Sequence, residues 1–165
     1  MDRKEQNKFL SEEYSEAIRY MDNAKETLQR AGKDGNNYKD RKYVQTACGT
    51  AYCGILIALN AWFVIKGIPG PARNKRKSIG YYISNIARKD KKMASDMDEV
   101  YTILHLDGYY GGMTRVKTIE SGFDIAYEII ERIKPEYFVP AEETRAQGMK
   151  RGLDKLLISM AVMFR

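Results

Sequence analysis

His105 is the only histidine among the 165 residues of the chain, and imidazole is the one side chain whose ordinary pKa lies near neutrality. Any acid–base chemistry of the histidine kind must therefore use this residue. It precedes a turn rich in glycine and tyrosine, in which Asp107, Tyr109 and Tyr110 are candidate helpers or ligand contacts. Because a lone histidine at a helix end is more often structural, we treat His105 as a catalytic candidate only. The alternative for the turn is that its two tyrosine rings simply cover the end of the helices.

Phosphate binding is the second chemistry that the sequence offers, because cations gather in two short clusters. The first cluster, after a stretch rich in proline and glycine, comprises Arg73, Lys75, Arg76 and Lys77. The second comprises Arg88, Lys89, Lys91 and Lys92. A net charge of +6 permits contact with nucleic acid without requiring it. Both clusters are therefore binding candidates, with ordinary solvated lysines as the alternative.

Metal and cofactor chemistry lacks the residue patterns that it needs. The chain has no Glu-x-x-His pair for a di-iron centre, no glycine-rich loop ending in Gly-Lys-Ser/Thr and no Gly-x-Gly-x-x-Gly run. Two cysteines and one histidine are too few for a four-ligand zinc site. Cys48 and Cys53 would point to different sides of one helix, so we expect two unbridged thiols in the core. We therefore predict neither a metal nor a cofactor.

The segment from Val44 to Ile65 must organise the elements that position these groups, because it carries no charged residue. Apolar side chains occur on every side of it, which is typical of a helix surrounded by protein or by lipid. Polar residues, alanines and glycines dilute its hydropathy, so we predict a buried core helix and no membrane span. Asn60 within it then needs hydrogen-bond partners. No apolar signal segment opens the chain, so we expect a cytoplasmic protein.

A helix and a loop are predicted ahead of this central segment. Apolar residues recur in steps of three and four from Tyr14 to Ala31, which indicates a helix with one buried face. Ser11 is expected to cap this helix, and the residues before it to be frayed. A loop rich in glycine and asparagine follows, and Asp40 at its end is expected to cap the central helix.

Two further helices are predicted after the central segment. Ser78 is a plausible cap for the first of them, and a continuous apolar register favours one long helix over residues 78–106. Two shorter helices meeting near Lys91 are the alternative. Thr114 is expected to cap the next helix, over residues 116–133.

No segment shows the sustained alternation of a β-strand. The sequence therefore predicts one all-α domain over residues 1–165, an up-down four-helix bundle with its core at about 10–134. An additional C-terminal helix is expected within about 140–165, packed either on its own chain or on a second subunit.

The order of these helices resembles that of the HEPN-type helical bundles, including the helical partners of minimal nucleotidyltransferases. The resemblance covers roughly residues 10–134 and rests on layout. A first helix bears tyrosines, a small-rich and then bulky second helix follows, and a long third helix ends in histidine and a Gly-Tyr turn. The segments that carry it are YSEAIRYMDNAKETL, AYCGILIALNAWFVIKG and, for the fourth helix, IESGFDIAYEIIERI. The resemblance implies a homodimer, with a nucleotidyltransferase-type protein as a further partner.

Active members of that family are ribonucleases in which two subunits contribute an Arg-x(4–6)-His motif to one cleft. Only His105 can match the histidine of this motif, and the positions for its arginine hold Asp98, Glu99 and Val100. A phosphate-binding cation is thus replaced by acids or an apolar residue. The resemblance therefore implies the helical bundle without the ribonuclease chemistry.

Three functions follow from these observations. The first is a non-catalytic binding or interaction module, with the tyrosine turn as a contact surface. The second is a ribonuclease-type enzyme that uses His105, and the third is a non-catalytic RNA or DNA binder that uses the basic clusters. The missing arginine favours the first.

Overall fold

The computed structural model describes residues 2–71 and 75–135, and this part of the chain is mostly helical, with one two-residue-per-strand hairpin. The all-α prediction is therefore confirmed. The predicted C-terminal helix, at about 140–165, and Arg73 lie outside the described residues. The elements in chain order are α1 (Arg3–Arg30), β1 (Lys33–Asp34), β2 (Asn37–Tyr38), α2 (Arg41–Ile65), α3 (Ile79–Ala87), α4 (Lys91–Val100), the π-helix η1 (Tyr101–Tyr110) and α5 (Val116–Arg132).

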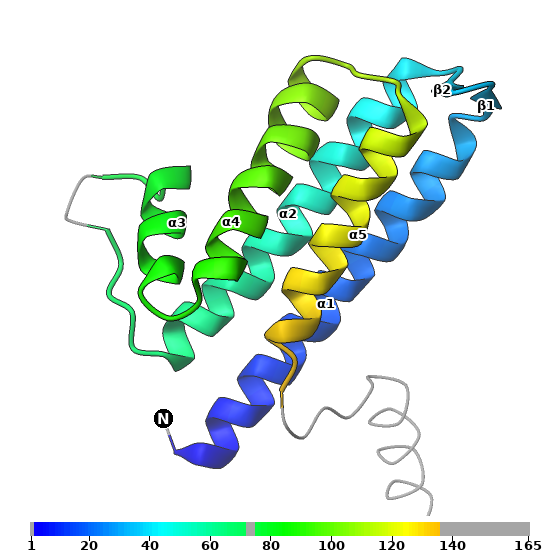
Figure 1. Ribbon diagram of the computed structural model, residues 1–165. Coiled ribbons are helices and arrows are strands. Elements are labelled where there is room, and N and C mark those ends of the chain that lie inside the picture. The colour runs from blue at the N-terminus through cyan, green and yellow to red at the C-terminus, as the bar shows by residue number, and fades with distance from the viewer. Residues whose placement is uncertain (1, 72–74, 136–165) are drawn as a thin grey trace, which may run out of the picture.

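The long helices lie side by side, and α2 is their common neighbour (Figure 1). It packs against α1, η1 and α5. The chain runs one way in α1 and in the continuous α4–η1 unit, and the opposite way in α2 and α5 (Figure 1). The short α3 packs on α4, and the β1–β2 hairpin lies at the end of the molecule where η1 turns into α5 (Figure 1).

Burial explains why α2 carries no charge beyond its first turn. Val44, Ala47, Ala51, Ile55 and Leu59 are fully buried, because three helices surround this side of α2. Small residues let α1 come close, since a Cβ on Gly54 would lie 3.1 Å from the carbonyl oxygen of Ala17. The prediction that α2 is a buried core helix is therefore confirmed only for the side that faces α1, η1 and α5.

The other side of α2 is not fully covered within the described part of the chain. Cys53 and Val64 are exposed, so the expectation that both cysteines lie in the core is wrong for Cys53. By length and hydropathy, α2 is also the one helix among the described residues that could cross a membrane, and half of the residues in that apolar window are buried in protein.

Two predicted helix caps are wrong because other groups satisfy the first amides, although α5 begins at Val116 as predicted. Helix α1 begins at Arg3, well before Ser11, because Asp2 forms a capping box with Glu5. Helix α5 has no side-chain cap from Thr114. The amide of Val116 instead donates to the carbonyl oxygen of Asn36 at 2.9 Å, which ties α5 to the hairpin.

The single helix favoured for residues 78–106 is also wrong, and the two-helix alternative is correct. Ser78 caps α3 as predicted, but this helix ends at Ala87. Asp90 is extended, with φ −149° and ψ 104°, and its carboxylate accepts a hydrogen bond from the amide of Met93 at 2.9 Å. Asp90 therefore caps a new helix, α4, and Arg132 of α5 pairs with the same carboxylate at 3.5 Å.

Candidate functional site: an aromatic surface around His105

His105 lies in the middle of the π-helix η1, whose wider turn brings four aromatic rings together. A π-helix is stabilised by i→i+5 hydrogen bonds, and the amide of Gly111 donates in this way to the carbonyl oxygen of Leu106 at 2.7 Å. Tyr101, His105 and Tyr109 follow one another in steps of four. π-Helices are rare, and those that occur are frequently found at functional sites. This segment is therefore a candidate functional site.

The rings of η1 meet a tyrosine from α2 at the imidazole. The His105 ring centroid lies 4.5 Å from that of Tyr52, 5.2 Å from that of Tyr101 and 5.0 Å from that of Tyr110. Tyr109 is stacked beyond, at 6.1 Å. We call the five residues Tyr52, Tyr101, His105, Tyr109 and Tyr110 the His–Tyr surface.

Close packing between η1 and α2 holds this surface in place. A Cβ on Gly108 would lie 2.5 Å from the Sγ of Cys48, so only glycine fits there without a shift. Gly49 leaves equally little room, since its Cβ would lie 2.9 Å from the ring of Tyr109. The side-chain amide of Gln45 also donates to the carbonyl oxygen of Tyr109 at 2.9 Å. The backbone of η1 and the ring of Tyr109 are thus both held against α2.

The outer part of the His–Tyr surface is open to solvent. Tyr110 is 65 % exposed and Tyr109 43 %, and Leu106 beside them is 42 % exposed. These are three of the five large hydrophobic residues that are exposed in the described part of the chain. An exposed cluster of this kind, fixed on a rigid helix, is typical of contact surfaces.

The electrostatics of His105 suit stacking better than proton transfer. Burial lowers the pKa of His105 below its ordinary value of 6.5, so the ring is neutral at pH 7. Among the described residues, no hydrogen bond or ion pair orients the imidazole. Asp98 and Glu99 are exposed and Val100 is buried, so no cation replaces the missing arginine there. The ribonuclease alternative gains no support from this geometry.

Asp107 is not brought into the His–Tyr surface by any ring contact. It is partly buried in η1, and its backbone carbonyl oxygen accepts a hydrogen bond from the amide of Met113 at 2.9 Å. Its visible role is therefore to hold the turn between η1 and α5.

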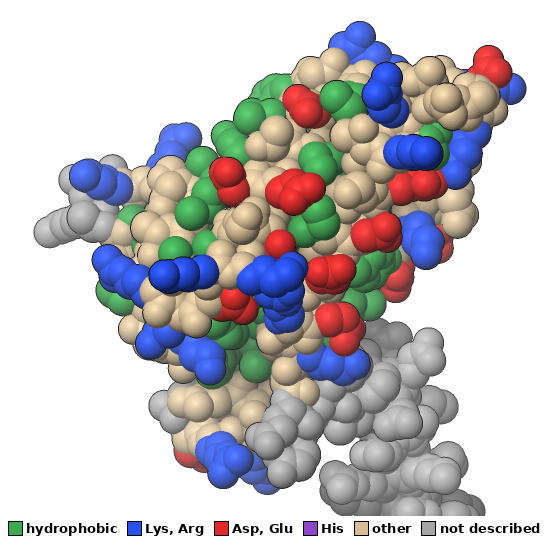
Figure 2. Space-filling model, in the orientation of Figure 1, with side chains coloured by type: hydrophobic (Ala, Val, Ile, Leu, Met, Phe, Trp, Pro, Cys, Tyr) green, Lys and Arg blue, Asp and Glu red, His purple; other side chains and the backbone are tan. Residues whose placement is uncertain are grey.

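The two basic clusters flank α3. Lys75, Arg76 and Lys77 precede this nine-residue helix and Arg88 and Lys89 follow it, about 14 Å away at 1.5 Å per residue. Blue Lys and Arg side chains accordingly gather over the α3 side of the molecule (Figure 2).

In the described part of the chain, two of the cations in these clusters have structural partners, and one of them, Lys92, pairs with Asp96 at 3.0 Å. The Nζ atom of Lys77 donates to Oδ1 of Asn60 at 2.7 Å, and the Tyr82 hydroxyl donates to the same oxygen at 2.8 Å. Asn60 is thus a satisfied polar group, as predicted. The basic clusters stand at the opposite end of the α4–η1 unit from the His–Tyr surface, so the structure does not combine the two candidate sites (Figure 1).

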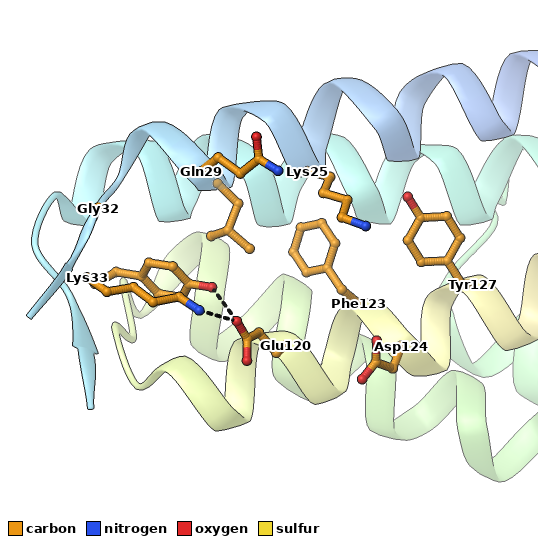
Figure 3. Close-up of a pocket in the computed structure, with 10 residues that line it drawn as sticks. Lys25, Gln29, Gly32, Lys33, Glu120, Phe123, Asp124 and Tyr127 are labelled. Atoms are coloured by element: carbon orange, nitrogen blue, oxygen red, sulfur yellow. Dashed lines mark hydrogen bonds and ion pairs between the residues drawn. The ribbon is translucent and has the colours of Figure 1, made fainter. Parts of the chain in front are cut away.

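A groove between α1 and α5 was not predicted from the sequence. It has a volume of about 530 Å³ and lies beside the hairpin (Figure 3). The groove is lined by Lys25, Leu28, Gln29, Gly32, Lys33, Tyr38, Glu120, Phe123, Asp124 and Tyr127. We call it the α1–α5 groove. The signal that could have found it is the spacing of Glu120, Asp124 and Tyr127, which places all three along one edge of α5.

Tyrosine–carboxylate hydrogen bonds bridge α5 to α1 and to the hairpin. Tyr127 donates to Asp22 at 3.5 Å and Tyr38 donates to Glu120 at 3.4 Å. Lys33 pairs with the same Glu120 oxygen at 2.7 Å (Figure 3). Burial and the neighbouring Glu120 carboxylate raise the pKa of Tyr38 to about 12. Within the described residues, no group of three or more His, Cys, Asp or Glu side chains could hold a metal ion.

The chain is similar to one family of proteins and to a solved structure. The family described as Domain of unknown function (DUF5618) matches residues 12–135. A solved structure of a protein of unknown function from Dyadobacter fermentans is similar, with 36 % sequence identity and a TM-score of 0.66 over 75 % of this chain and 94 % of that one. The search of curated proteins returned no match.

Proposed function

Since the chain belongs to the family described as Domain of unknown function (DUF5618), we propose its function from its own surfaces: it is a non-catalytic interaction module that binds a second copy of itself through the His–Tyr surface. The observation that carries this proposal is the exposure of Leu106, Tyr109 and Tyr110 on one rigid turn. Aromatic side chains are enriched in protein interfaces because they bury a large area at low entropic cost.

The choice of a second copy as partner rests on the HEPN-type resemblance, in which two subunits contribute the histidine motif to one cleft. A neutral imidazole packed among tyrosines can be covered by an identical surface without burying a charge. In a two-fold dimer each surface would meet its own copy, so one patch supplies both halves of the contact.

Light scattering on the purified chain tests the proposal, with Tyr110→Ser as the disrupting variant. We expect a dimer for the wild type and a dissociation constant at least about tenfold higher for the variant, because an interface aromatic is often worth more than 1 kcal/mol. Val64→Ser is the matched control, since Val64 is 57 % exposed but lies at the far end of α2. A monomeric wild type, or equal weakening by both variants, would refute the proposal.

The basic clusters around α3 favour a second function, binding to the phosphates of nucleic acid. Between Lys75 and Lys89 the chain has five cations and no acidic residue. If four of them meet phosphates of a single strand, the logarithm of the binding constant should fall with the logarithm of the salt concentration with a slope of about −3. Fluorescence anisotropy with labelled single-stranded RNA measures this slope. Binding that is absent at low salt excludes this function and leaves the docking proposal intact.

A further inference from the structure

The α1–α5 groove has opposite charges on its two walls and an apolar floor. Leu28 and Phe123 form the floor, and both are almost fully buried by the protein. Lys25 and Lys33 line the side of α1 and the hairpin, whereas Glu120 and Asp124 line the side of α5. Lys25 extends from α1 toward the rings of Phe123 and Tyr127, and Asp124 lies across from it on α5 (Figure 3).

The charges in the groove are not equally engaged. Lys33 and Glu120 are paired with each other at 2.7 Å, and Tyr38 also donates to Glu120. Lys25 and Asp124, by contrast, have no ion pair or side-chain hydrogen bond with any residue in the described part of the chain. One ammonium group and one carboxylate therefore face the groove with their hydrogen-bonding capacity free for a ligand.

The size and the charge pattern together define the class of ligand. A volume of about 530 Å³ lies within the range of small-molecule sites, about 300 to 1,000 Å³. An anionic ligand would be repelled by the α5 wall and a cationic one by the α1 wall, whereas a ligand with both charges would be attracted by both. An apolar group on the same ligand would cover Leu28 and Phe123.

We propose that the α1–α5 groove binds a small zwitterionic molecule with an apolar side chain, of the α-amino acid class. Lys25 binds the carboxylate of the ligand, Asp124 binds its ammonium group, and Phe123 packs against its side chain. This site lies between α1 and α5 and is independent of docking at the His–Tyr surface, so either proposal can fail without the other.

Isothermal titration of the full chain with L-phenylalanine and L-leucine tests the site. We expect saturable binding of at least one of them, with a dissociation constant between about 10 µM and 1 mM for a groove that is open on one side. Two analogues of phenylalanine each lack one charge, namely 3-phenylpropionate and phenethylamine. Each should bind at least about tenfold more weakly, because one charge-assisted hydrogen bond is lost.

Two charge-removing variants locate the binding in the groove. Lys25→Gln and Asp124→Asn should each weaken binding about tenfold. The matched controls, Lys4→Gln and Asp98→Asn, change the same charges on exposed residues outside the groove and should bind as the wild type does. Thermal unfolding checks that every variant is folded, and the analogue series on the wild type decides the question if one is not. Failure of both amino acids to bind, equal binding of an analogue, or unchanged binding by both groove variants would overturn the proposal.

Discussion

The helix–helix interface between η1 and α2, which we call the closed seam, and the interface between α1 and α5, which we call the open seam, are built in opposite ways. In the first, small residues bring the backbones together, so that a Cβ on Gly108 would lie 2.5 Å from the Sγ of Cys48. In the second, long polar side chains bridge α5 to the hairpin, as Glu120 and Lys33 do, and to α1, as Tyr127 and Asp22 do, and a groove of about 530 Å³ remains between α1 and α5. Apolar packing closes a seam, whereas hydrogen-bonded side chains hold one open. The closed seam therefore presents the rigid outer surface for which we propose docking, and the open seam presents the groove for which we propose a small ligand.

Thiol chemistry gives the largest expected contrast between the closed seam and the exposed side of α2. Burial raises the pKa of Cys48 from its ordinary value of 9.0 to about 12, which lowers its thiolate fraction at neutral pH about a thousandfold. Cys53 is exposed. Ellman's reagent should therefore titrate one thiol in the folded chain and both in guanidinium chloride. Loss of the fast reaction in Cys53→Ser is the control. Two fast thiols in the folded chain would show that η1 does not close over Cys48.

Filling the closed seam should destabilise the fold. Gly108→Ala places a methyl group against Cys48 and against the carbonyl oxygen of Ile103, and we expect the free energy of unfolding to fall by about 1 to 3 kcal/mol. Urea denaturation measures this change. Gly70→Ala is the control, because nothing lies within 4 Å of the added methyl group, and its stability should be equal or slightly higher. Equal stability of both variants would contradict the close approach of η1 to α2.

Breaking the ion pair between Lys33 and Glu120 at the open seam should lower the pKa of Tyr38 measurably and should have only a small effect on the free energy of unfolding. Glu120→Gln removes the ion pair with Lys33, whose two side chains are about half exposed, so the free energy of unfolding should fall by less than about 1 kcal/mol. The same change removes a negative charge beside Tyr38, whose pKa should fall below about 12 but stay above its ordinary value of 10.0, because burial, the largest cause of the rise, remains. Ultraviolet titration of the tyrosines measures this fall against Glu99→Gln, where no change is expected. A loss of several kcal/mol would mean that this seam is packed like the first.

Protonation of His105 should have the smallest effect. Its pKa in the folded chain is lowered by burial, so the unfolded chain, with a pKa of about 6.5, takes up the proton first as the pH falls. The stability contributed by the neutral ring is therefore full above about pH 7 and is lost as the pH falls below 6.5. Solvent screens the partly exposed ring, so the loss should be a fraction of the about 1.4 kcal/mol that one pKa unit represents.

Urea denaturation at pH 7.5 and 5.5 measures this loss, because the carboxylates titrate mostly below that range. His105→Gln, which leaves the chain without a histidine, should show a smaller difference between the two pH values than the wild type. An equal difference in both proteins would contradict the burial of the imidazole.

Local patterns were enough to predict the main helices and much of the core. All the apolar residues predicted on one face of the first helix, from Tyr14 to Ala31, are buried in the structure. Asp40 caps α2 and the helix ends at Ile65, as expected from neighbouring residues alone. The break at Asp90 was hidden because the apolar register continues across it, and Arg132, which pairs with Asp90 from α5, lies 42 residues further along the chain.

The candidate sites, too, could be predicted only where their residues are close together in the sequence. The tyrosine turn after His105 could be recognised as a candidate because all its residues are close in sequence, and the structure shows that both its tyrosines are exposed. The basic clusters were equally visible, but their separation by α3 appeared only once the break at Asp90 was known. Nothing in the sequence predicted that residues 101–110 form a π-helix or that Tyr52 joins them.

The sequence by itself determined the main helical segments, much of the core and the place of the tyrosine turn, because these properties follow from residues within a few turns of one another. Only the tertiary structure decided that Tyr52 stacks on His105 and that Lys25 faces Asp124 across a groove. Such pairs lie on different helices, and their meeting depends on how closely the backbones approach. Here that approach is set by glycine at one seam and by bridging charged side chains at the other.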